Sequence, residues 1–241
     1  MTFGIEEPLL DQLAQRNVPL VFVDVGPERP GVSLLKVDYH QGIQQGVQHL
    51  AALGHREIAF ITGPVRLHSA QSRLKAFQSA MEQCGIKQHA NLIFEGDHTL
   101  EGGMAATKLL LSKKKVPTAV MCSNDMTAIG VLHTMYRAGL RVPDDLSVIG
   151  FDNIHFAEVT IPPLTTVEMS RLDIARAAVS ALRAQVEATE GAVPKTDYQI
   201  GTELIVREST GAPRVLAKQA RKPKTQPVSY THLTLPTIYS V

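Results

Sequence analysis

The chain has 241 residues, of which 44% are hydrophobic and 20% charged, and its formal net charge is +1. This composition is typical of a soluble globular protein, long enough to bury a sizeable core as one large domain or two small ones. A net charge near zero supplies no basic excess of the kind that attracts a phosphate backbone, which excludes a free-standing DNA-binding protein.

The sequence contains no run of about eighteen apolar residues that could span a bilayer. Its first ten residues carry Glu6, Glu7 and Pro8, where a signal peptide would have positive charge followed by an apolar stretch. We therefore expect a cytoplasmic protein. The two cysteines, Cys84 and Cys122, lack the spacing of a disulfide framework or zinc site, and we interpret both as buried apolar residues.

A short apolar strand followed by an amphipathic helix recurs along most of the chain, a pattern that predicts parallel βαβ units. In the first half, Ser69 and Thr99 are the expected N-caps of two helices. The elements predicted there are strand 19–24, helix 40–53, strand 57–63, helix 69–85, strand 91–95 and helix 99–112.

In the second half, Gly139 is expected to end a helix that begins near Asn124. Met126, Ile129 and Tyr136 of this helix are predicted to face inward. The elements predicted there are strand 118–122, helix 123–139, strand 145–152, a break at Pro162 and Pro163, helix 171–189 and strand 199–207.

Polar residues recur where an apolar strand ends: Asp24, Asn124 with Asp125, and Asp152 with Asn153. In an open parallel sheet, ligands bind outside the carboxyl ends of the strands, where helix N-termini and loops from several βα units converge. The alternative is that each of these residues only caps the helix after it. Their joint recurrence favours a ligand pocket.

Catalytic and nucleotide motifs are absent. Neither GxGxxG nor GxxxxGK[ST] occurs, and there is no GxSxG elbow or HExxH pair. The nine histidines are scattered; His55, directly after Gly54, is assigned to a surface turn and His133 to mid-helix. No nucleophile and base pair can be named, so the residues themselves indicate a non-catalytic α/β ligand binder with no cofactor and no metal.

Several segments resemble the effector-binding core of the LacI/GalR family of bacterial transcription regulators. The resemblance runs in order from about Val18 to about Ser209. The stretch that ends in Gly-Phe-Asp at Asp152, together with the Pro-Pro-Leu-Thr-Thr that follows, is highly specific to this family. The segments that carry it are 18–24, 37–39, 46–64, 72–77, 117–125, 139–153 and 162–167.

The resemblance implies an α/β, periplasmic-binding-protein-like fold: two Rossmann-like, doubly wound parallel subdomains with a small molecule in the cleft between them. Residues 37–169 with 199–210 would form the C-terminal subdomain. Residues 1–36 with 170–198 would be an incomplete N-terminal subdomain, because relatives begin with a helix-turn-helix, a hinge helix and further strands and helices. We expect those parts, including the DNA-binding domain, to be absent here.

The resemblance also implies an effector site. Asp24 matches an acidic residue that often bonds the ligand, Arg73 an arginine that reaches into the cleft, Asn124 the asparagine of the Ser-Asn-Asp motif, and Asp152 the aspartate of Gly-Phe-Asp. Ser69 is assigned to the same site. Carboxylates that accept from neighbouring hydroxyls and a guanidinium that donates two fixed N–H groups suit a sugar, while nucleosides and purines would use the same pair.

Three features depart from the family pattern. Relatives commonly have glycine where this chain has Ala76 and Ala175, and they have the additional front. Residues 211–241 match nothing in the family: a basic run, 218–224, precedes an uncharged end, 228–241. We interpret this tail as disordered or non-native sequence, the alternative being a nucleic-acid-binding tail.

Together these features predict the sensor part of a repressor, homodimeric in the full-length protein, that reaches operator DNA only through its missing N-terminal domain. Ligand closure of the cleft would change how two subunits are oriented, and so whether their DNA-binding domains reach adjacent half-sites. A transport-type periplasmic sugar-binding protein of the same fold is the alternative, and an enzyme is a third. No membrane association is expected.

Overall fold

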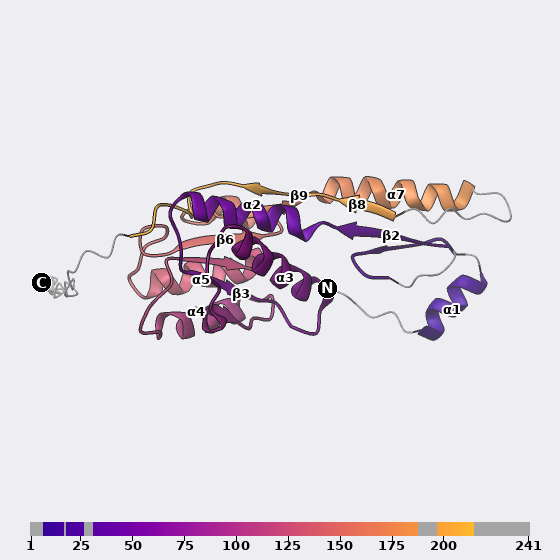
Figure 1. Ribbon diagram of the computed structural model, residues 1–241. Helices are drawn as coiled ribbons and strands as arrows, with labels where there is room; N and C mark the ends of the chain where they lie inside the picture. Colours follow the sequence, from indigo (N-terminus) through magenta and orange to yellow (C-terminus); the bar gives the residue numbers. More distant parts are fainter. Residues whose placement is uncertain (1–6, 17, 27–30, 188–196, 215–241) are drawn as a thin grey trace, which may run out of the picture.

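The computed structural model describes residues 7–16, 18–26, 31–187 and 197–214, which form two sheets flanked by helices (Figure 1). A six-stranded sheet has the order β4-β3-β5-β6-β7-β9, and a three-stranded sheet has the order β1-β2-β8. All neighbouring strands are parallel except β7 and β9. The predicted mixed α/β fold with parallel sheets is therefore confirmed.

The six-stranded region comprises residues 38–169 and 201–214. Its sheet is built from β3 (Ile58–Ile61), β4 (Ile93–Phe94), β5 (Ala119–Cys122), β6 (Ser147–Phe151), β7 (Thr165–Met169) and β9 (Thr202–Ile205). Its helices are α2 (Tyr39–Ala52), α3 (His68–Gln83), α4 (Leu100–Leu111), α5 (Asp125–Arg137) and α6 (Phe156–Val159), with a 3-10 turn at Ala90–Leu92.

Two apolar cores cover the two faces of this sheet, as a doubly wound fold requires. Alternate residues of each strand supply them: Phe60 joins the core under α2 and α3, whereas Ile61 joins the core under α4 and α5. Phe77 of α3 stacks on Phe60 with ring centroids 4.7 Å apart, and both are completely buried. The strands read as continuous apolar runs because both of their faces are covered.

The prediction of which α5 residues face inward was wrong. Met126 is 36% exposed and Tyr136 is 81% exposed, and Ile129 is only half-buried. The reason is close helix packing: a Cβ on Gly130 would lie 2.2 Å from the Leu100 carbonyl of α4. Small residues must therefore occupy the inner side, and the buried apolar positions of α5 are Ala128, Val131, Leu132 and Met135.

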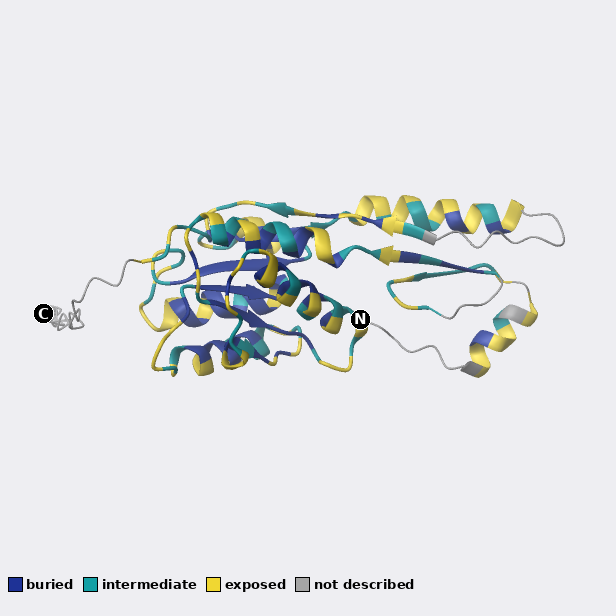
Figure 2. Ribbon diagram, viewed as in Figure 1, coloured by how far each residue is buried: buried dark blue, intermediate teal, exposed yellow. Residues whose placement is uncertain are grey.

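The three-stranded region comprises the described residues of 7–37, 170–187 and 197–200. Its strands are β1 (Leu20–Val23), β2 (Val32–Val37) and β8 (Asp197–Ile200), and its helices are α1 (Glu7–Gln15) and α7 (Arg171–Glu187). Only Ala181 and Gln185 of α7 are buried, and Val179 and Val186 are more than 60% exposed. Figure 2 shows this region as largely exposed or intermediate, in contrast to the dark interior of the six-stranded region.

Three single-residue joints connect the two regions: Asp38 between β2 and α2, Ser170 between β7 and α7, and Gly201 between β8 and β9. Hydrogen bonds tie the first joint to the third. The Asp38 N–H donates to the Ile200 carbonyl at 2.8 Å, and the Thr202 hydroxyl donates to the Asp38 carbonyl at 2.6 Å. The predicted single strand over 199–207 is thus two strands, one in each sheet.

Local predictions had mixed outcomes. Thr99 caps α4 as expected, accepting from the Gly102 N–H at 3.0 Å, but α3 begins at His68, so Ser69 is not its cap. Cys122 is buried, whereas Cys84 is only half-buried. The sequence did not predict five of the described elements, namely α1, β2, the 3-10 turn at Ala90–Leu92, α6 and β7.

The segment Gly211–Arg214, assigned to the tail, contacts the six-stranded region. The ring of His55, which is buried rather than exposed in a turn, lies with Nε2 2.8 Å from the Gly211 carbonyl and Nδ1 2.8 Å from the Thr118 hydroxyl. Arg214 forms an ion pair with Asp145. The rest of the predicted tail, 215–241, lies outside the described residues.

Candidate functional site

Arg73, in the second turn of α3, carries a buried guanidinium at the carboxyl ends of β5 and β6. Nη1 donates to the carbonyl of Ser123, directly after β5, and Nη2 donates to Oδ1 of Asp152, directly after β6, at 3.4 Å. The rings of Phe151 and Tyr39 lie 4.1 Å and 4.9 Å from Cζ. Two aromatic faces and two acceptors therefore fix this cation in one orientation.

One donor of Arg73 is left over. Its Nε–H is buried and has no hydrogen-bond partner among the residues that the structure describes. A buried, unpaired donor costs about 1–3 kcal/mol, so such groups are rare where a residue serves stability alone. This cost favours a functional reason for the position of Arg73.

Asp152 faces Arg73 from a strained turn. Its φ is +105° and that of Asn153 is +46°, in the left-handed range that few non-glycine residues adopt. Burial raises the pKa of the Asp152 carboxyl, and the positive charges of Arg73 and Arg171 oppose that rise. The side chain keeps 30% of its surface exposed, so the carboxylate can also accept hydrogen bonds from outside the protein.

The three-stranded region contributes Asp24, which directly follows β1 and has a φ of +73°. Tyr39, the first residue of α2, lies where the two regions meet: the Arg73 guanidinium lies over its ring, and the charges of Arg73 and Asp24 both act on its hydroxyl. Burial raises the pKa of Tyr39 to about 12, so the hydroxyl stays protonated. His68 approaches from α3, with Nδ1 3.7 Å from Oδ2 of Asp24.

A hollow of about 640 Å³ opens where the two regions meet. Both regions line it: Asp24 and Lys36 belong to the three-stranded region, and Tyr39, Ser72 and Lys75 belong to α2 and α3. Its walls combine carboxylates, hydroxyls, imidazoles and ammonium groups, whereas Arg73 and Asp152 lie beside the hollow and do not line it. This lining suits a small polar ligand with several hydroxyl or oxygen atoms.

The other two predicted site residues have different surroundings. The Asn124 side chain is an N-cap, because Oδ1 accepts from the Thr127 N–H at 3.0 Å, and Nδ2 donates to the His98 carbonyl at 2.9 Å. Ser69 is half-buried, one helical turn before Arg73 on the same side of α3. The structure therefore pairs Arg73 with Asp152, places Asp24 and Tyr39 on the wall of one hollow, and gives Asn124 the capping role considered as the alternative.

Sequence reasoning missed Tyr39 and His98. The His98 ring, after β4, lies with Nε2 2.9 Å from the Ser123 hydroxyl, and burial followed by the charge of Arg73 lowers its pKa to about 4. A neutral imidazole therefore stands beside Arg73. Gly63 leaves space for this ring, since a Cβ there would lie 1.8 Å from Nε2. One signal was available in the sequence: His98 belongs to the segment after an apolar strand, four positions past the end of β4, whereas Asp24 and Asp152 directly follow theirs.

No group of three or more His, Cys, Asp or Glu residues that could hold a metal ion occurs within 7–16, 18–26, 31–187 and 197–214. Among the helices described, none is long and apolar enough to cross a membrane.

Comparisons with known proteins match this architecture. Residues 47–210 match the family model described as a periplasmic binding protein-like domain. A curated relative, the HTH-type transcriptional repressor PurR of Photobacterium profundum, is 34% identical over 210 residues, which cover 87% of this chain and 62% of the relative. The PurR repressor of Glaesserella parasuis is 37% identical, over 80% of this chain and 58% of the relative. The chain thus spans about six-tenths of the length of these curated relatives.

Three similar solved structures are regulators by their descriptions. A LacI transcriptional regulator from a Rhodococcus species has a TM-score of 0.78 at 31% identity, covering 88% of this chain and 77% of its own. A dimeric Lac repressor has a TM-score of 0.72 at 32% identity, covering 86% of this chain and 74% of its own. A sugar-binding regulator of the LacI family from Escherichia coli has a TM-score of 0.73 at 27% identity, covering 86% of this chain and 73% of its own. The chain belongs to the periplasmic binding protein-like family and is an effector-binding domain of the LacI/GalR type.

Proposed function

We propose that this chain is the sensing part of a DNA-binding repressor and binds a small polar effector, a sugar, where its two regions meet. The observation that carries the proposal is the buried guanidinium of Arg73, which donates to Asp152 and lies over the ring of Tyr39, a residue that lines the hollow together with Asp24 of the other region. An effector that contacts Asp24 and Asp152 at once would connect the two regions through its own hydroxyl groups.

The chemistry of the site favours a polyhydroxylated ligand. The carboxylates of Asp24 and Asp152 accept hydrogen bonds, and Arg73, the Tyr39 hydroxyl and the neutral His98 ring supply donors. The sugar-binding LacI-family regulator among the similar structures supports this class. Nucleosides and purines remain the second ligand class, because an aspartate and an arginine also suit their heteroatoms and the Phe151 and Tyr39 rings could pack against a base.

The first experiment is a thermal-shift screen of the 241-residue chain against pentoses, hexoses, nucleosides and purine bases, followed by calorimetric titration of each compound that stabilises it. Arg73→Ala should weaken binding tenfold to a hundredfold, since the loss of a charged hydrogen-bonding group costs about 1.5–3 kcal/mol. Arg137→Ala, on the exposed end of α5, is the matched control. If the parent and Arg73→Ala bind the ligand with equal affinity, the effector site does not include Arg73.

The regulatory role is tested at the gene. The coding sequence that surrounds this chain in its genome should specify a helix-turn-helix domain before it, and the neighbouring operon should hold transport or catabolic genes for the effector. Operator binding by that longer protein, measured by mobility shift, should change when the effector is added. A transport-type binding protein, the alternative, would instead be preceded by an export signal and would not bind DNA. The regulator names of the relatives favour the first outcome and a cytoplasmic site of action.

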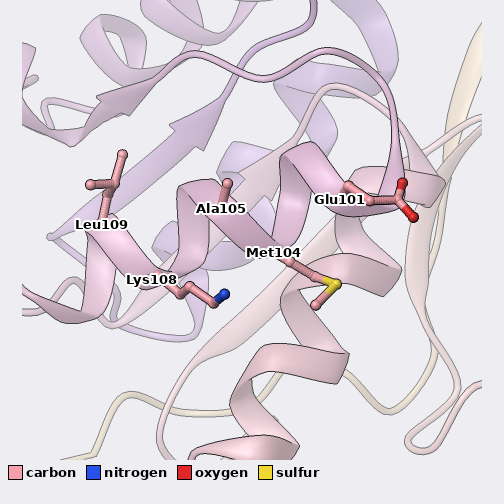
Figure 3. Close-up of a pocket in the computed structure, with 5 residues that line it drawn as sticks. All are labelled: Glu101, Met104, Ala105, Lys108 and Leu109. Atoms are coloured by element: carbon pink, nitrogen blue, oxygen red, sulfur yellow. The ribbon is translucent and has the colours of Figure 1, made fainter.

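The proposal includes a homodimer of the full-length protein, as the dimeric Lac repressor structure suggests. A shallow apolar surface along one side of α4, with a hollow of about 500 Å³, is a candidate part of the dimer interface (Figure 3). Leu109 is 60% exposed there, next to Met104 and Ala105, with Glu101 and Lys108 at the edge. Exposed apolar surface of this kind is typical of a protein contact.

Leu109→Glu should shift the dimer towards monomer in light scattering of the longer protein, whereas Val116→Glu, at an apolar residue 39% exposed outside this surface, should not. A dimer unaffected by Leu109→Glu would place the interface elsewhere.

A further inference from the structure

The carboxylate of Asp125 lies completely buried beneath the turn that carries Asp152. Asp125 is the first residue of α5, and its two oxygens have different partners. Oδ2 accepts from the Ile154 N–H at 2.8 Å, and Oδ1 accepts from the Thr166 hydroxyl of β7 at 2.6 Å. One side chain thus connects α5 with β7 and with the turn after β6.

Gly150 of β6 makes room for this arrangement. A Cβ at Gly150 would lie 2.1 Å from Oδ1 of Asp125, closer than any side chain can tolerate. Gly150 is the register partner of Thr166 across β6 and β7, so the carboxylate passes over the glycine to reach the hydroxyl. The sequence therefore provides a carboxylate on α5, a glycine without a side chain on β6 and a hydroxyl on β7.

The turn held by this carboxylate needs support. Asp152 and Asn153 are consecutive residues with positive φ, a conformation that costs on the order of 1–3 kcal/mol per residue and persists only when neighbouring groups fix it. Several hydrogen bonds fix it here: the Ile154 N–H donates to Asp125, the Asp152 N–H donates to the Val167 carbonyl at 2.8 Å, and Arg207 donates to Oδ1 of Asn153 at 2.8 Å. The Asn153 N–H also donates to the Thr166 hydroxyl at 3.4 Å. In this turn conformation, Oδ1 of Asp152 lies 3.4 Å from Nη2 of Arg73.

We propose that Asp125 is a positioning residue of the effector site: its carboxylate fixes the turn 152–154 so that Asp152 faces Arg73. The role rests on the proposed function above, since Asp152 is assigned to the effector there. Asp125 itself has no exposed surface and does not touch the ligand.

The charge of Asp125 is secondary to its geometry. Burial raises its pKa to about 6, while the bonds from Thr166 and Ile154 oppose the rise, Asp152 reinforces it and Arg207 opposes it. The charge of Asp125 also adds to the rise that burial causes in the pKa of Cys122 on β5. An asparagine would keep both contacts, with its oxygen accepting from Ile154 and its amide donating to the Thr166 oxygen once that hydroxyl has turned. An alanine would keep neither.

The direct test is hydrogen exchange of peptides covering 150–156 in the 241-residue chain, measured by mass spectrometry without ligand. Asp125→Ala should speed exchange in this turn at least about tenfold, and Asp125→Asn by less than about threefold. Thr134→Ala, which removes a buried hydroxyl from the same helix without touching the turn, is the control and should leave 150–156 unchanged. Should Asp125→Ala fail to fold, Asp125→Ser, whose side chain is too short to reach both partners, should give an intermediate rate; Thr166→Val is no substitute, because the Thr166 hydroxyl also accepts from the Asn153 N–H of the turn.

The second readout is calorimetric titration of the same variants with each pentose, hexose or nucleoside that binds the parent chain. Asp125→Ala should lose at least about tenfold in affinity and Asp125→Asn less than about threefold. The positioning role is overturned if the turn exchanges as slowly in Asp125→Ala as in the parent. It is also overturned if the turn exchanges as fast in Asp125→Asn as in Asp125→Ala. If no compound in the panel binds the parent, the proposed function fails, and the exchange rates still decide the role of Asp125.

Discussion

The two regions of this chain follow the same strand and helix alternation, yet they bury their strands to different extents. In the six-stranded region, helices cover both faces of the sheet, and all residues of β3, β5 and β6 are buried. In the three-stranded region, β1 has no buried residue and α7 buries only two side chains. Stability contributed by apolar burial should therefore be concentrated in the six-stranded region.

The largest expected effect that follows from this difference is at Phe77. Phe77→Ala should lower the free energy of unfolding of the six-stranded region by about 3–5 kcal/mol, because it leaves a cavity against Phe60. Leu182→Ala on α7, where the side chain is 38% exposed, should cost less than about 1 kcal/mol. Urea unfolding followed by circular dichroism measures both. Equal losses would show that the two regions bury their side chains alike.

The next effect concerns Gln185, the buried polar residue of α7. Its amide donates to the Leu20 carbonyl and the Ser33 hydroxyl and accepts from the Leu20 N–H, so it anchors α7 to β1 and β2. Gln185→Ala should destabilise the three-stranded region by about 1–3 kcal/mol, because these groups lose their partner. Hydrogen exchange should accelerate in β1 and β2 and not in β5. Gln78→Ala, on the exposed side of α3, should change neither region.

A smaller effect should appear at the contact between the regions. Tyr39→Phe keeps the ring against Phe151, whose centroid lies 5.8 Å away, but removes the hydroxyl on which the charges of Asp24 and Arg73 act. We expect the free energy of unfolding to fall by about 0.5–1.5 kcal/mol. If the two regions unfold in separate urea transitions, these should move further apart, because a polar group between the regions is lost. Tyr136→Phe, at a hydroxyl on the surface, is the control. Transitions that stay equally close would mean that Tyr39 does not couple the regions.

The smallest effect is a pH dependence confined to the six-stranded region, since the described part of the other region has no histidine. The pKa of His98 is lowered to about 4, so the unfolded chain takes up a proton below about pH 6.5 that the folded protein refuses. Stability should therefore fall as the pH falls from about 6.5 to 4. Burial also lowers the pKa of His49 and His55, which act in the same direction.

Asp125 acts in the opposite direction, because its pKa is raised to about 6 and its protonation favours the folded state. His98→Asn should reduce the loss of stability between pH 7 and pH 5 by about 1 kcal/mol, a modest value because solvent screens the partly exposed ring. His133→Asn, at an exposed position, should leave the pH dependence as it is. An unchanged profile in His98→Asn would mean that the ring is protonated in the folded protein.

Hydrophobic periodicity predicted the elements with apolar faces, among them α2, β3, β5 and β6, but it missed β7. That strand contains Thr165 and Thr166, which look polar in sequence but are completely buried. Their hydroxyls have tertiary partners, including Asp125 for Thr166 and the Arg207 N–H for Thr165. No local pattern reveals such partners, because they come from segments about forty residues away.

The sequence likewise predicted some of the candidate site residues and missed others. The rule that ligands bind at strand carboxyl ends selected Asp24 and Asp152, and the family resemblance added Arg73. Tyr39 was missed because it follows β2, a strand that the sequence did not predict, and its role depends on a residue fifteen positions away in the other region. The capping role of Asn124 was an alternative that the sequence left open, and only the hydrogen bond to Thr127 shows it.

The joints between the regions constrain how the molecule can bend. Asp38 and the segment around Gly201 share hydrogen bonds, and the Thr202 hydroxyl also accepts from the Gly42 N–H at 2.9 Å. A change of backbone torsion at one of these two joints must therefore displace the other and the first turn of α2. Since Tyr39 belongs to that turn, rotation of one region against the other must also move the ring that lies against Arg73.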